Sequence, residues 1–371
     1  MTPFTFRTAT EIRFGRGTAR TVAPDVAALG RRVLLVGGGT AARSDWLAEA
    51  LAAEGCTVDR FAVSGEPDVA TIQAGVAVAE GAGVIVSLGG GAVIDTGKAI
   101  AGLRPSPRPL MDHLEVVGKG LPLEAAPLPF VALPTTAGTG AEVTKNAVIG
   151  VPEARRKVSL RDDRMLADLA VVDPELTDGA PRGVTLASGL DAVTQVIEPY
   201  LSAKANPLTD ALCRAAIPGG LAALARLMEG EDPDARDALA YCSLSGGLAL
   251  ANAGLGAVHG LAGPIGGVAP APHGAVCGAL LPHVMDANAA AADGALAERI
   301  AEVRVWIDAA LGGADLARWS RDAGLPGLGD MGLSEDDLSD VAEAAQGSSS
   351  MKGNPVTLST GTLIDLMRAA W

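Results

Sequence analysis

A short stretch of the chain reads Val84-Ile85-Val86-Ser87-Leu88-Gly89-Gly90-Gly91, an apolar run that ends in a glycine triplet. An earlier stretch, Val33-Leu34-Leu35-Val36, is likewise followed by Gly37-Gly38-Gly39. Glycines between a strand and a helix let a pyrophosphate approach the backbone and the free amides of the helix N-terminus. The same triplets also suit a tight turn that binds nothing, because neither shows the Gly-x-Gly-x-x-Gly pattern. Together the two stretches favour a dinucleotide-binding α/β fold.

The first half of the chain continues this alternation of strands and helices. Apolar runs predict strands at residues 33–36, 58–63, 84–88, 130–134 and 170–172, and helical spacing predicts helices at 44–54, 69–80 and 94–101. Such an order implies parallel strands that are joined by crossover helices. We therefore expect an N-terminal α/β domain with a parallel, Rossmann-like sheet.

The second half has a different composition. After Pro181, Ala, Leu and Gly dominate, and the stretches 207–228 and 234–253 are rich in helix-forming residues. The breaker residues Asp178-Gly179-Ala180-Pro181 mark the change. We therefore predict a nucleotide-binding α/β domain over residues 1–180 and an all-α domain, for metal and substrate, over residues 181–371.

Charge and cysteine content narrow the classes of function. The chain has 371 residues and a formal net charge of −14, and an acidic chain without a Lys/Arg run is a poor partner for nucleic acid. Its four cysteines form no Cys-x-x-Cys pair and predict reduced thiols. The sequence contains no run of about twenty uninterrupted apolar residues and no secretory signal pattern at its start. We expect a cytoplasmic protein that binds neither nucleic acid nor a membrane.

A third candidate loop for the nucleotide follows the strand expected at 130–134. It reads Leu133-Pro134-Thr135-Thr136-Ala137-Gly138-Thr139-Gly140-Ala141-Glu142-Val143-Thr144. Its hydroxyls could bond a phosphate or a ribose, although a Thr/Gly loop that is capped by Thr139 explains the same residues. Ligands of α/β proteins bind at the carboxyl ends of parallel strands. Three such loops at one edge of a sheet therefore favour a nucleotide site.

Four residues of the second half suit a metal site or a proton-transfer site. Asp191 and Gln195 are four residues apart and lie on one face if their segment is helical. His259 and His273 lie in a glycine-rich stretch further along the chain. A carboxylate with imidazoles suits zinc or ferrous iron. A structural role without a metal stays open. Asp191 and Gln195 could be a helix start and an exposed amide, and a histidine is often structural.

Several long motifs occur in order along the chain. They are Gly89-Gly90-Gly91-x-x-x-Asp95-x-x-Lys98, Pro134 to Thr144, Gly189-Leu190-Asp191-Ala192, His259-Gly260-Leu261-Ala262, Pro272-His273-Gly274 and Leu281-Pro282-His283-Val284. Together they resemble the iron-containing alcohol dehydrogenase family over essentially the whole chain. The resemblance implies a dehydroquinate synthase-like fold and NAD(P)-dependent interconversion of a small alcohol and an aldehyde or ketone. It also implies a homodimer.

Carried over to this chain, the resemblance implies a set of cofactor residues and a set of metal ligands. The cofactor residues are Gly37, Gly38, Thr40, Gly89, Gly90, Gly91, Asp95, Thr135, Thr136, Thr139 and Lys157. The metal positions are Asp191, Gln195, His259 and His273, and the iron or zinc ion would polarise the substrate oxygen. His259 and His273 are also the candidate catalytic residues, because either could protonate the developing alkoxide without a metal.

Three positions depart from the family pattern. The family has a histidine where this chain has Gln195, and an amide oxygen binds zinc or ferrous iron less well than imidazole does. We therefore expect metal binding to be weakened or lost. Gly263 stands where many members have a second histidine, four residues after the first. Gly38 stands where NAD-preferring members have an acid, and with Thr40 and Arg43 beside it this favours NADP(H) over NAD(H).

Two other functions fit many of the same residues. One is a maleylacetate reductase-like enzyme that works without metal, and the other is a nucleotide-binding homologue whose metal site has decayed. Asp191, His259, His273 and all three candidate cofactor loops are present. They favour an NAD(P)-dependent alcohol dehydrogenase or carbonyl reductase.

Overall fold

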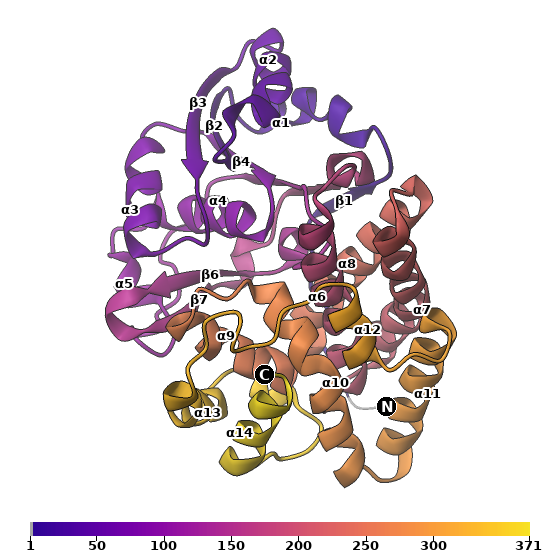
Figure 1. The fold of residues 1–371 in the computed structure, drawn as a ribbon. Helices are drawn as coiled ribbons and strands as arrows, with labels where there is room; N and C mark the ends of the chain where they lie inside the picture. Colours follow the sequence, from indigo (N-terminus) through magenta and orange to yellow (C-terminus); the bar gives the residue numbers. More distant parts are fainter. Residues whose placement is uncertain (1–2) are drawn as a thin grey trace. The chain divides into compact units, whose positions relative to one another are not determined.

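The chain folds into two compact units. In the computed structural model, which describes residues 3–371, one unit comprises Thr8–Thr136 and Gly140–Thr177. The other comprises Asp178–Trp371, the short segment Ala137–Thr139 and the N-terminal residues up to Arg7. The first unit alternates strands and helices and the second is helical (Figure 1), which confirms the predicted fold class.

A six-stranded sheet forms the centre of the α/β unit. Its strands are β1 (Glu11–Phe14), β2 (Arg32–Gly38), β3 (Thr57–Val63), β4 (Val84–Gly89), β5 (Phe130–Pro134) and β8 (Leu169–Val172). Their order is β1-β8-β5-β4-β2-β3, and all neighbouring strands are parallel. Every strand except β1 matches a predicted one. Because β2, β4 and β5 are neighbours, the loops that follow them lie at one edge of the sheet.

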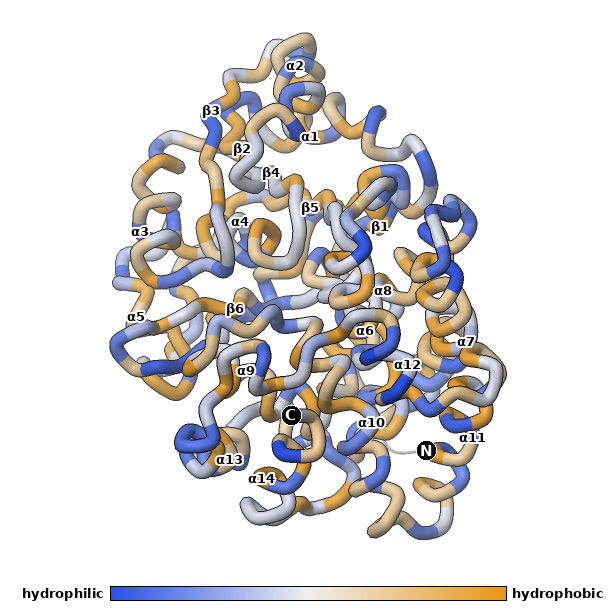
Figure 2. Tube along the Cα trace, viewed as in Figure 1, coloured by the Kyte–Doolittle hydropathy of each residue, from blue (hydrophilic) through white to orange (hydrophobic). Residues whose placement is uncertain are grey.

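Helices cover both faces of this sheet. They are α1 (Ala23–Leu29), α2 (Asp45–Ala53), α3 (Val69–Val78), α4 (Gly91–Leu103) and the short α5 (Leu110–His113). On one face, α1 and α2 pack against alternate apolar residues of β2, β4, β5 and β8. On the other, α4 contacts both the sheet and the antiparallel hairpin of β6 (Asn146–Val151) and β7 (Arg156–Arg161). Figure 2 shows apolar residues of α4 and β6 in orange. Apolar material on both faces explains why the central strands are unbroken apolar runs.

A buried lysine ties α4 to the hairpin. Lys98 is 1% exposed, and its ammonium Nζ donates to the carbonyl of Ala141 at 2.6 Å. It also donates to Thr144 Oγ1 at 2.9 Å and to the carbonyl of Asn146 at 2.8 Å. An ammonium group has three donors, so these bonds use its full capacity.

Two acidic residues surround this lysine. Asp95, on the preceding turn of α4, accepts a hydrogen bond from the amide of Val148 at 3.0 Å and lies 3.7 Å from the Lys98 ammonium. Glu142 is 2% exposed, and burial raises its pKa to about 7. We call Asp95, Lys98, Glu142 and Thr144 the lysine cluster.

The second unit is a set of packed helices. They are α6 (Arg182–Leu201), α7 (Pro207–Glu229), α8 (Pro233–Ala253), α9 (Ala257–Val268), α10 (His273–Ala291), α11 (Gly294–Leu311), α12 (Leu316–Asp322), α13 (Leu338–Gln346) and α14 (Thr360–Ala369). Helix α6 contacts α7, α8 and α10 and is buried from residue 189 onward. Helix α7 is long and apolar enough to cross a membrane, as core helices of globular proteins also are, and it packs against α6, α8 and α11.

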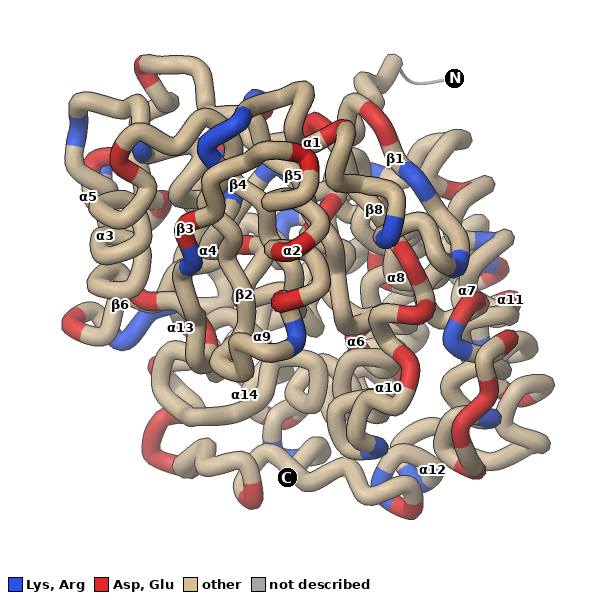
Figure 3. Tube along the Cα trace, turned by 90° about the horizontal axis from the view of Figure 1, so that it is seen from above, with Lys and Arg blue, Asp and Glu red and all other residues tan. Residues whose placement is uncertain are grey.

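Charged residues of both signs are spread over the described chain. Figure 3 shows Lys and Arg scattered among Asp and Glu in that view. Several pairs are in contact, such as Arg60 with Asp45 at 2.5 Å and Arg304 with Asp286 at 2.7 Å. Pairs of this exposed kind contribute little to stability, so the fold depends mainly on its apolar cores.

Candidate functional site

The glycine triplet after β4 and the threonines after β5 lie side by side in the α/β unit. A Cβ built at Gly89 would lie 2.6 Å from the side chain of Val93, so only glycine fits there. A Cβ at Gly90 would lie 3.3 Å from Thr136 Oγ1. The amide of Thr135 donates to the Gly89 carbonyl at 3.0 Å. Two of the three loops predicted to bind the nucleotide therefore share one region.

This edge of the sheet offers hydrogen-bond donors to an anion. Helix α4 begins at Gly91, and within residues 3–371 its N-terminus has no side-chain cap. The amide of Val93 already donates to the Gly90 carbonyl at 2.9 Å, so the amides of Gly91 and Ala92 are the first-turn donors that could bind a phosphate. The third loop follows β2, whose Gly37 pairs with Leu88 of β4, and Thr40 precedes a short 3-10 helix there. The edge has the features of a phosphate site.

The other residues predicted to bind the cofactor have different partners. Asp95 belongs to the lysine cluster, where it holds the amide of Val148 on β6. Lys157 on β7 forms an ion pair with Glu66. Thr139 lies in the segment that groups with the helical unit. These contacts tie Asp95 and Lys157 to parts of the α/β unit other than the glycine triplet.

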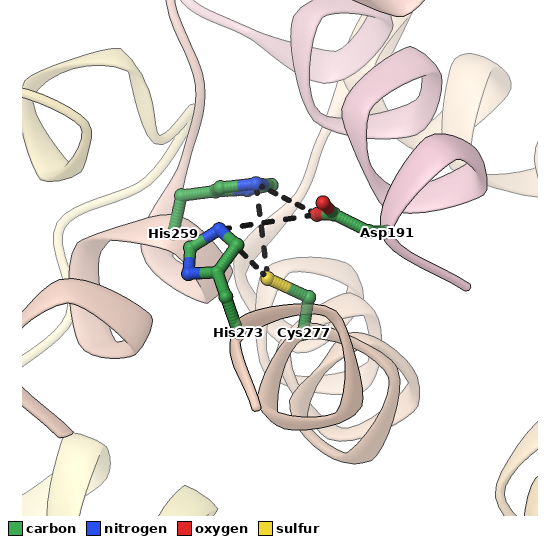
Figure 4. Close-up of side chains that lie close together, drawn as sticks. All are labelled: Asp191, His259, His273 and Cys277. Atoms are coloured by element: carbon green, nitrogen blue, oxygen red, sulfur yellow. Dashed lines mark hydrogen bonds and ion pairs between the residues drawn. The ribbon is translucent and has the colours of Figure 1, made fainter. Parts of the chain in front are cut away.

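Three helices of the second unit bring four metal-binding side chains together. Asp191 comes from α6, His259 from α9, and His273 and Cys277 from α10, and all four point toward one another in Figure 4. One ligand atom from each lies within 4.8 Å of the others. The sequence predicted the first three members but not Cys277. We call these four residues the histidine cluster.

Glycines explain how α10 approaches α6 closely enough to form this cluster. A Cβ at Gly274 would lie 2.3 Å from a backbone carbonyl of α6, and one at Gly278 would lie 2.6 Å from a leucine side chain of α6. His273 begins α10 and Cys277 follows four residues later, on the same helix face. Close packing at the two glycines therefore sets both side chains beside Asp191.

The distances within the histidine cluster suit a shared ligand. His259 Nε2 lies 3.3 Å and His273 Nε2 lies 3.9 Å from Asp191 Oδ1. Cys277 Sγ lies 3.7 Å from each of these two nitrogens. Among the described residues, Asp191 Oδ1 is a buried atom with no hydrogen-bond partner of good geometry. A buried carboxylate oxygen in that state is costly, and a divalent cation would satisfy it.

Glu198 fixes the orientation of His259. Its Oε2 accepts a hydrogen bond from His259 Nδ1 at 2.6 Å, and its Oε1 accepts one from the amide of Val258 at 2.7 Å. Glu198 follows Asp191 by seven residues on α6, so both carboxylates lie on the same helix face. The bond keeps a proton on Nδ1 and turns Nε2 toward the cluster, as carboxylates do behind metal-bound histidines.

Charges inside the cluster shift the pKa values of its members. Burial lowers the pKa of both imidazoles, but Cys277 and the neighbouring carboxylates outweigh burial. The pKa of His273 rises to about 9, and that of His259 rises well above its usual range. Burial raises the pKa of Asp191, but the two histidines outweigh it and hold that pKa below its usual value. The cluster thus favours an ionised carboxylate beside cations, whether protons or a metal.

Two of the three departures from the family pattern lie on α6 and α9. Gln195 is buried on α6, and its Nε2 donates to the carbonyl of Gly138 at 3.1 Å. Gly263 is on α9, one turn after His259, and a Cβ built there would meet nothing within 4 Å in the described chain. A larger side chain therefore fits at residue 263.

Cys277 and Glu198 are the two residues of this site that sequence reasoning missed. A signal for each exists in the spacing. Cys277 follows His273 by four residues and Glu198 follows Asp191 by seven, and both spacings place side chains on one face of a helix. Four well-separated cysteines give no such signal by themselves.

Known proteins resemble this chain over both of its halves. The model of the family described as iron-containing alcohol dehydrogenase matches residues 9–174, and the model of its C-terminal domain matches residues 185–371. The lactaldehyde reductase of Escherichia coli (strain K12) is 36% identical over 285 residues, which cover 75% of this chain and 74% of that protein. The NAD-dependent methanol dehydrogenase of Bacillus methanolicus is 31% identical over 295 residues, 74% of each chain.

A solved structure is similar over the full length of the chain. The crystal structure of 1,3-propanediol oxidoreductase superposes with a TM-score of 0.90 and 31% identity, and the match covers 100% of both chains. The relatives favour neither a maleylacetate reductase-like enzyme nor a decayed nucleotide-binding homologue. They are alcohol and aldehyde oxidoreductases of a family that depends on NAD(P) and a metal. This chain is therefore an oxidoreductase of alcohols and carbonyl compounds, and it belongs to the iron-containing alcohol dehydrogenase family.

Proposed function

We propose that the chain transfers a hydride between NADP(H) and a small alcohol or aldehyde, with help from a divalent metal that Asp191, His259 and His273 hold. One observation carries the proposal. Asp191 Oδ1 is buried without a hydrogen-bond partner among the described residues, and two imidazole nitrogens lie within 3.9 Å of it. The relatives are named for lactaldehyde, methanol and 1,3-propanediol, so the proposed substrate is a short aldehyde or its alcohol.

The residues around the proposed metal have distinct tasks. When bound, the metal would polarise the substrate oxygen as a Lewis acid. Asp191 supplies a negative oxygen, and Glu198 holds the proton of His259 on Nδ1 so that Nε2 faces the cluster. In a protein without metal, His259 and His273 would hold protons, because their pKa values lie above the usual range. Either could then give its proton to the developing alkoxide.

The proposed cofactor site lies at the carboxyl edge of the sheet. The pyrophosphate would bind the amides at the start of α4, beside Gly89 to Gly91 and the hydroxyls of Thr135 and Thr136. At the end of β2, Gly38 provides no acid to repel a 2′-phosphate, and the exposed Arg43 lies five residues later. Both features support NADP(H) as the preferred cofactor.

The cofactor preference has a direct test. A Cβ at Gly38 would meet nothing within 4 Å in the described chain, so Gly38→Asp is sterically allowed. The new carboxylate would repel the 2′-phosphate, and the ratio of kcat/KM for NADPH to that for NADH should fall by about tenfold, or 1.4 kcal/mol. Gly39→Asp, at a glycine with equal space, is the matched control. A wild-type enzyme that prefers NADH would contradict the proposal.

The function itself is tested with the purified protein. We expect oxidation of NADPH in the presence of short aldehydes, and the reverse reaction with the corresponding alcohols, after loading with zinc or ferrous iron. Asp191→Ala is the control that removes the proposed metal site while leaving the glycine loops intact. If a panel of short aldehydes and keto acids gives no turnover with either nucleotide, with or without metal, the proposal is wrong.

A further inference from the structure

We propose that Cys277 supplies the fourth donor of the metal site, as a thiolate, and so compensates for the glutamine at position 195. The inference rests on the metal site proposed above and names its complete donor set. That set is one carboxylate oxygen, two imidazole nitrogens and one sulfur, and it favours zinc over ferrous iron.

The distances place the sulfur where a fourth donor belongs. Donors that share a zinc ion at about 2.0–2.3 Å lie roughly 3.3–3.8 Å apart around a tetrahedron. Cys277 Sγ lies 3.7 Å from His259 Nε2 and 3.7 Å from His273 Nε2. The pair formed by His259 Nε2 and Asp191 Oδ1 is 3.3 Å apart, and all four donor atoms lie within 4.8 Å of one another. The sulfur is thus as well placed as the predicted ligands.

A second observation points to a ligand at the same place. Asp191 is 2% exposed, and its Oδ1, which faces the two imidazoles and the thiol, is without a hydrogen-bond partner among the described residues. A buried carboxylate oxygen is normally satisfied by a donor. The sulfur and this oxygen come from different helices, so their convergence is not a consequence of one helix face.

The amide nitrogen of Gln195 makes a hydrogen bond outside the histidine cluster. Its Nε2 donates to the carbonyl of Gly138 at 3.1 Å, which holds the amide against that loop. A Cβ built at Gly246 of α8 would lie 3.0 Å from the Cβ of Gln195, so α8 packs closely against the base of this side chain. Since a thiolate binds zinc better than an amide oxygen does, Cys277 rather than Gln195 takes the role that the family pattern gives to the missing histidine.

A thiolate changes the chemistry of the site. When the metal binds, the thiol loses its proton to solvent and the sulfur donates an electron pair to the ion. Two negative donors, Asp191 and Cys277, then balance a dication, where an aspartate with three neutral imidazoles provides only one negative charge. Sulfur is also a softer donor than imidazole, and this gives zinc an advantage over ferrous iron.

Cobalt reports directly on a thiolate ligand. We would load the metal-free, full-length protein with Co²⁺ and record the absorption spectrum, in which sulfur bound to cobalt gives an intense charge-transfer band in the near ultraviolet. We expect the band in the wild type and in Cys213→Ala, a control at another fully buried cysteine. Cys277→Ser and Cys277→Ala should both lack it. Stoichiometric cobalt binding without the band in the wild type would overturn the proposal, as would a band that persists in both Cys277 variants.

Metal affinity gives a second readout. Chelator competition should show zinc binding weakened by at least about tenfold in Cys277→Ala, since even residues that only orient ligands have effects of 10- to 100-fold. The ratio of zinc to ferrous iron affinity should fall in the same variant, and an unchanged ratio would contradict the thiolate. A protein that shows the cobalt band but no turnover would disprove the proposed function and leave this inference standing. Turnover without the cobalt band would disprove this inference and leave the proposed function standing.

Discussion

The lysine cluster of the α/β unit and the histidine cluster of the helical unit both bury charged side chains, but they satisfy them differently. Lys98 donates to Ala141, Thr144 and Asn146 and so uses all three donors of its ammonium group. Asp191, which is equally buried, keeps an oxygen without a hydrogen-bond partner among the described residues. The first cluster is complete as it stands, whereas the second has the donors for one more cation.

This difference indicates that the lysine cluster stabilises the fold and that the histidine cluster serves the proposed function. Buried polar groups are nearly always paired, and a fully paired group such as Lys98 stabilises one arrangement of its neighbours. A buried oxygen that accepts no hydrogen bond raises the free energy of the folded protein unless neighbouring cations or a ligand compensate for it. Substitutions in the lysine cluster should therefore change stability, and those in the histidine cluster should change metal binding and turnover.

The largest effect is expected for Asp191→Asn. The amide keeps the volume of the side chain but loses the negative charge, so metal content and kcat/KM should fall by more than about a hundredfold. Stability of the metal-free protein should change by only about 1–2 kcal/mol, because the two histidines can release their protons when the carboxylate is lost. Metal analysis, steady-state kinetics and urea unfolding measure the three quantities. Retention of both metal and activity would remove the main support for the site.

Lys98→Met should show the opposite pattern. The change leaves three buried acceptors without their donor and should lower the free energy of unfolding by roughly 3–5 kcal/mol. Zinc content per folded molecule should stay at the wild-type value. Lys119→Met, at a side chain that is 66% exposed in the same unit, is the matched control. If the variant does not accumulate, hydrogen exchange of the hairpin β6–β7 in Lys98→Arg gives the same comparison. If Lys98→Met had wild-type stability but bound no zinc, our assignment of the lysine cluster to stability would be wrong.

Glu198→Gln should have a smaller effect that is confined to the metal site. The amide oxygen of the variant would still accept a hydrogen bond from Val258, but the neutral side chain would no longer hold the proton on His259 Nδ1 as a carboxylate does. We expect zinc affinity to fall by about 10- to 100-fold and turnover to follow metal occupancy. The exposed Glu298→Gln controls for the lost charge. An affinity equal to that of the wild type would show that Glu198 does not position this histidine.

Much of the α/β unit could be predicted because its signals are local. Strands β2 and β4 are buried on both faces and appear in the sequence as continuous apolar runs that end in glycine. Strand β1 (Glu11–Phe14) was missed because it is an edge strand of mixed polarity. The hairpin formed by β6 and β7 was missed too, since its buried residues alternate with less buried ones and polar side chains stand between the apolar ones.

The histidine cluster was predicted only in part because its completion depends on helix packing. Asp191, His259 and His273 belong to motifs of the family, so the resemblance named them. Cys277 becomes a candidate only when α10 lies against α6, and this contact depends on Gly274 and Gly278. Spacing along one helix shows which residues share a face, but not which face meets another helix.

The last expected effect concerns the pH dependence of stability in the lysine cluster. Burial raises the pKa of Glu142 from its usual 4.5 to about 7 in the folded protein. The folded state therefore holds this proton more tightly than the unfolded state does, and the contribution of Glu142 is fully present below pH 4.5 and is lost as the pH rises to about 7. Glu142→Gln should remove this loss, so its stability relative to the wild type should rise by on the order of 3 kcal/mol over that interval.

Urea unfolding between pH 4.5 and pH 8 measures this difference, with the exposed Glu153→Gln as the matched control. Burial also lowers the pKa of Lys98 in the folded protein, so the effect of Glu142 is taken from the difference between the profiles of the wild type and Glu142→Gln. Parallel pH profiles for the wild type and Glu142→Gln would mean that Lys98 keeps the carboxylate ionised in the folded protein. The lysine cluster would then contain a second ion pair beside that of Lys98 with Asp95, and the contrast would rest on the Asp191 oxygen that has no hydrogen-bond partner among the described residues.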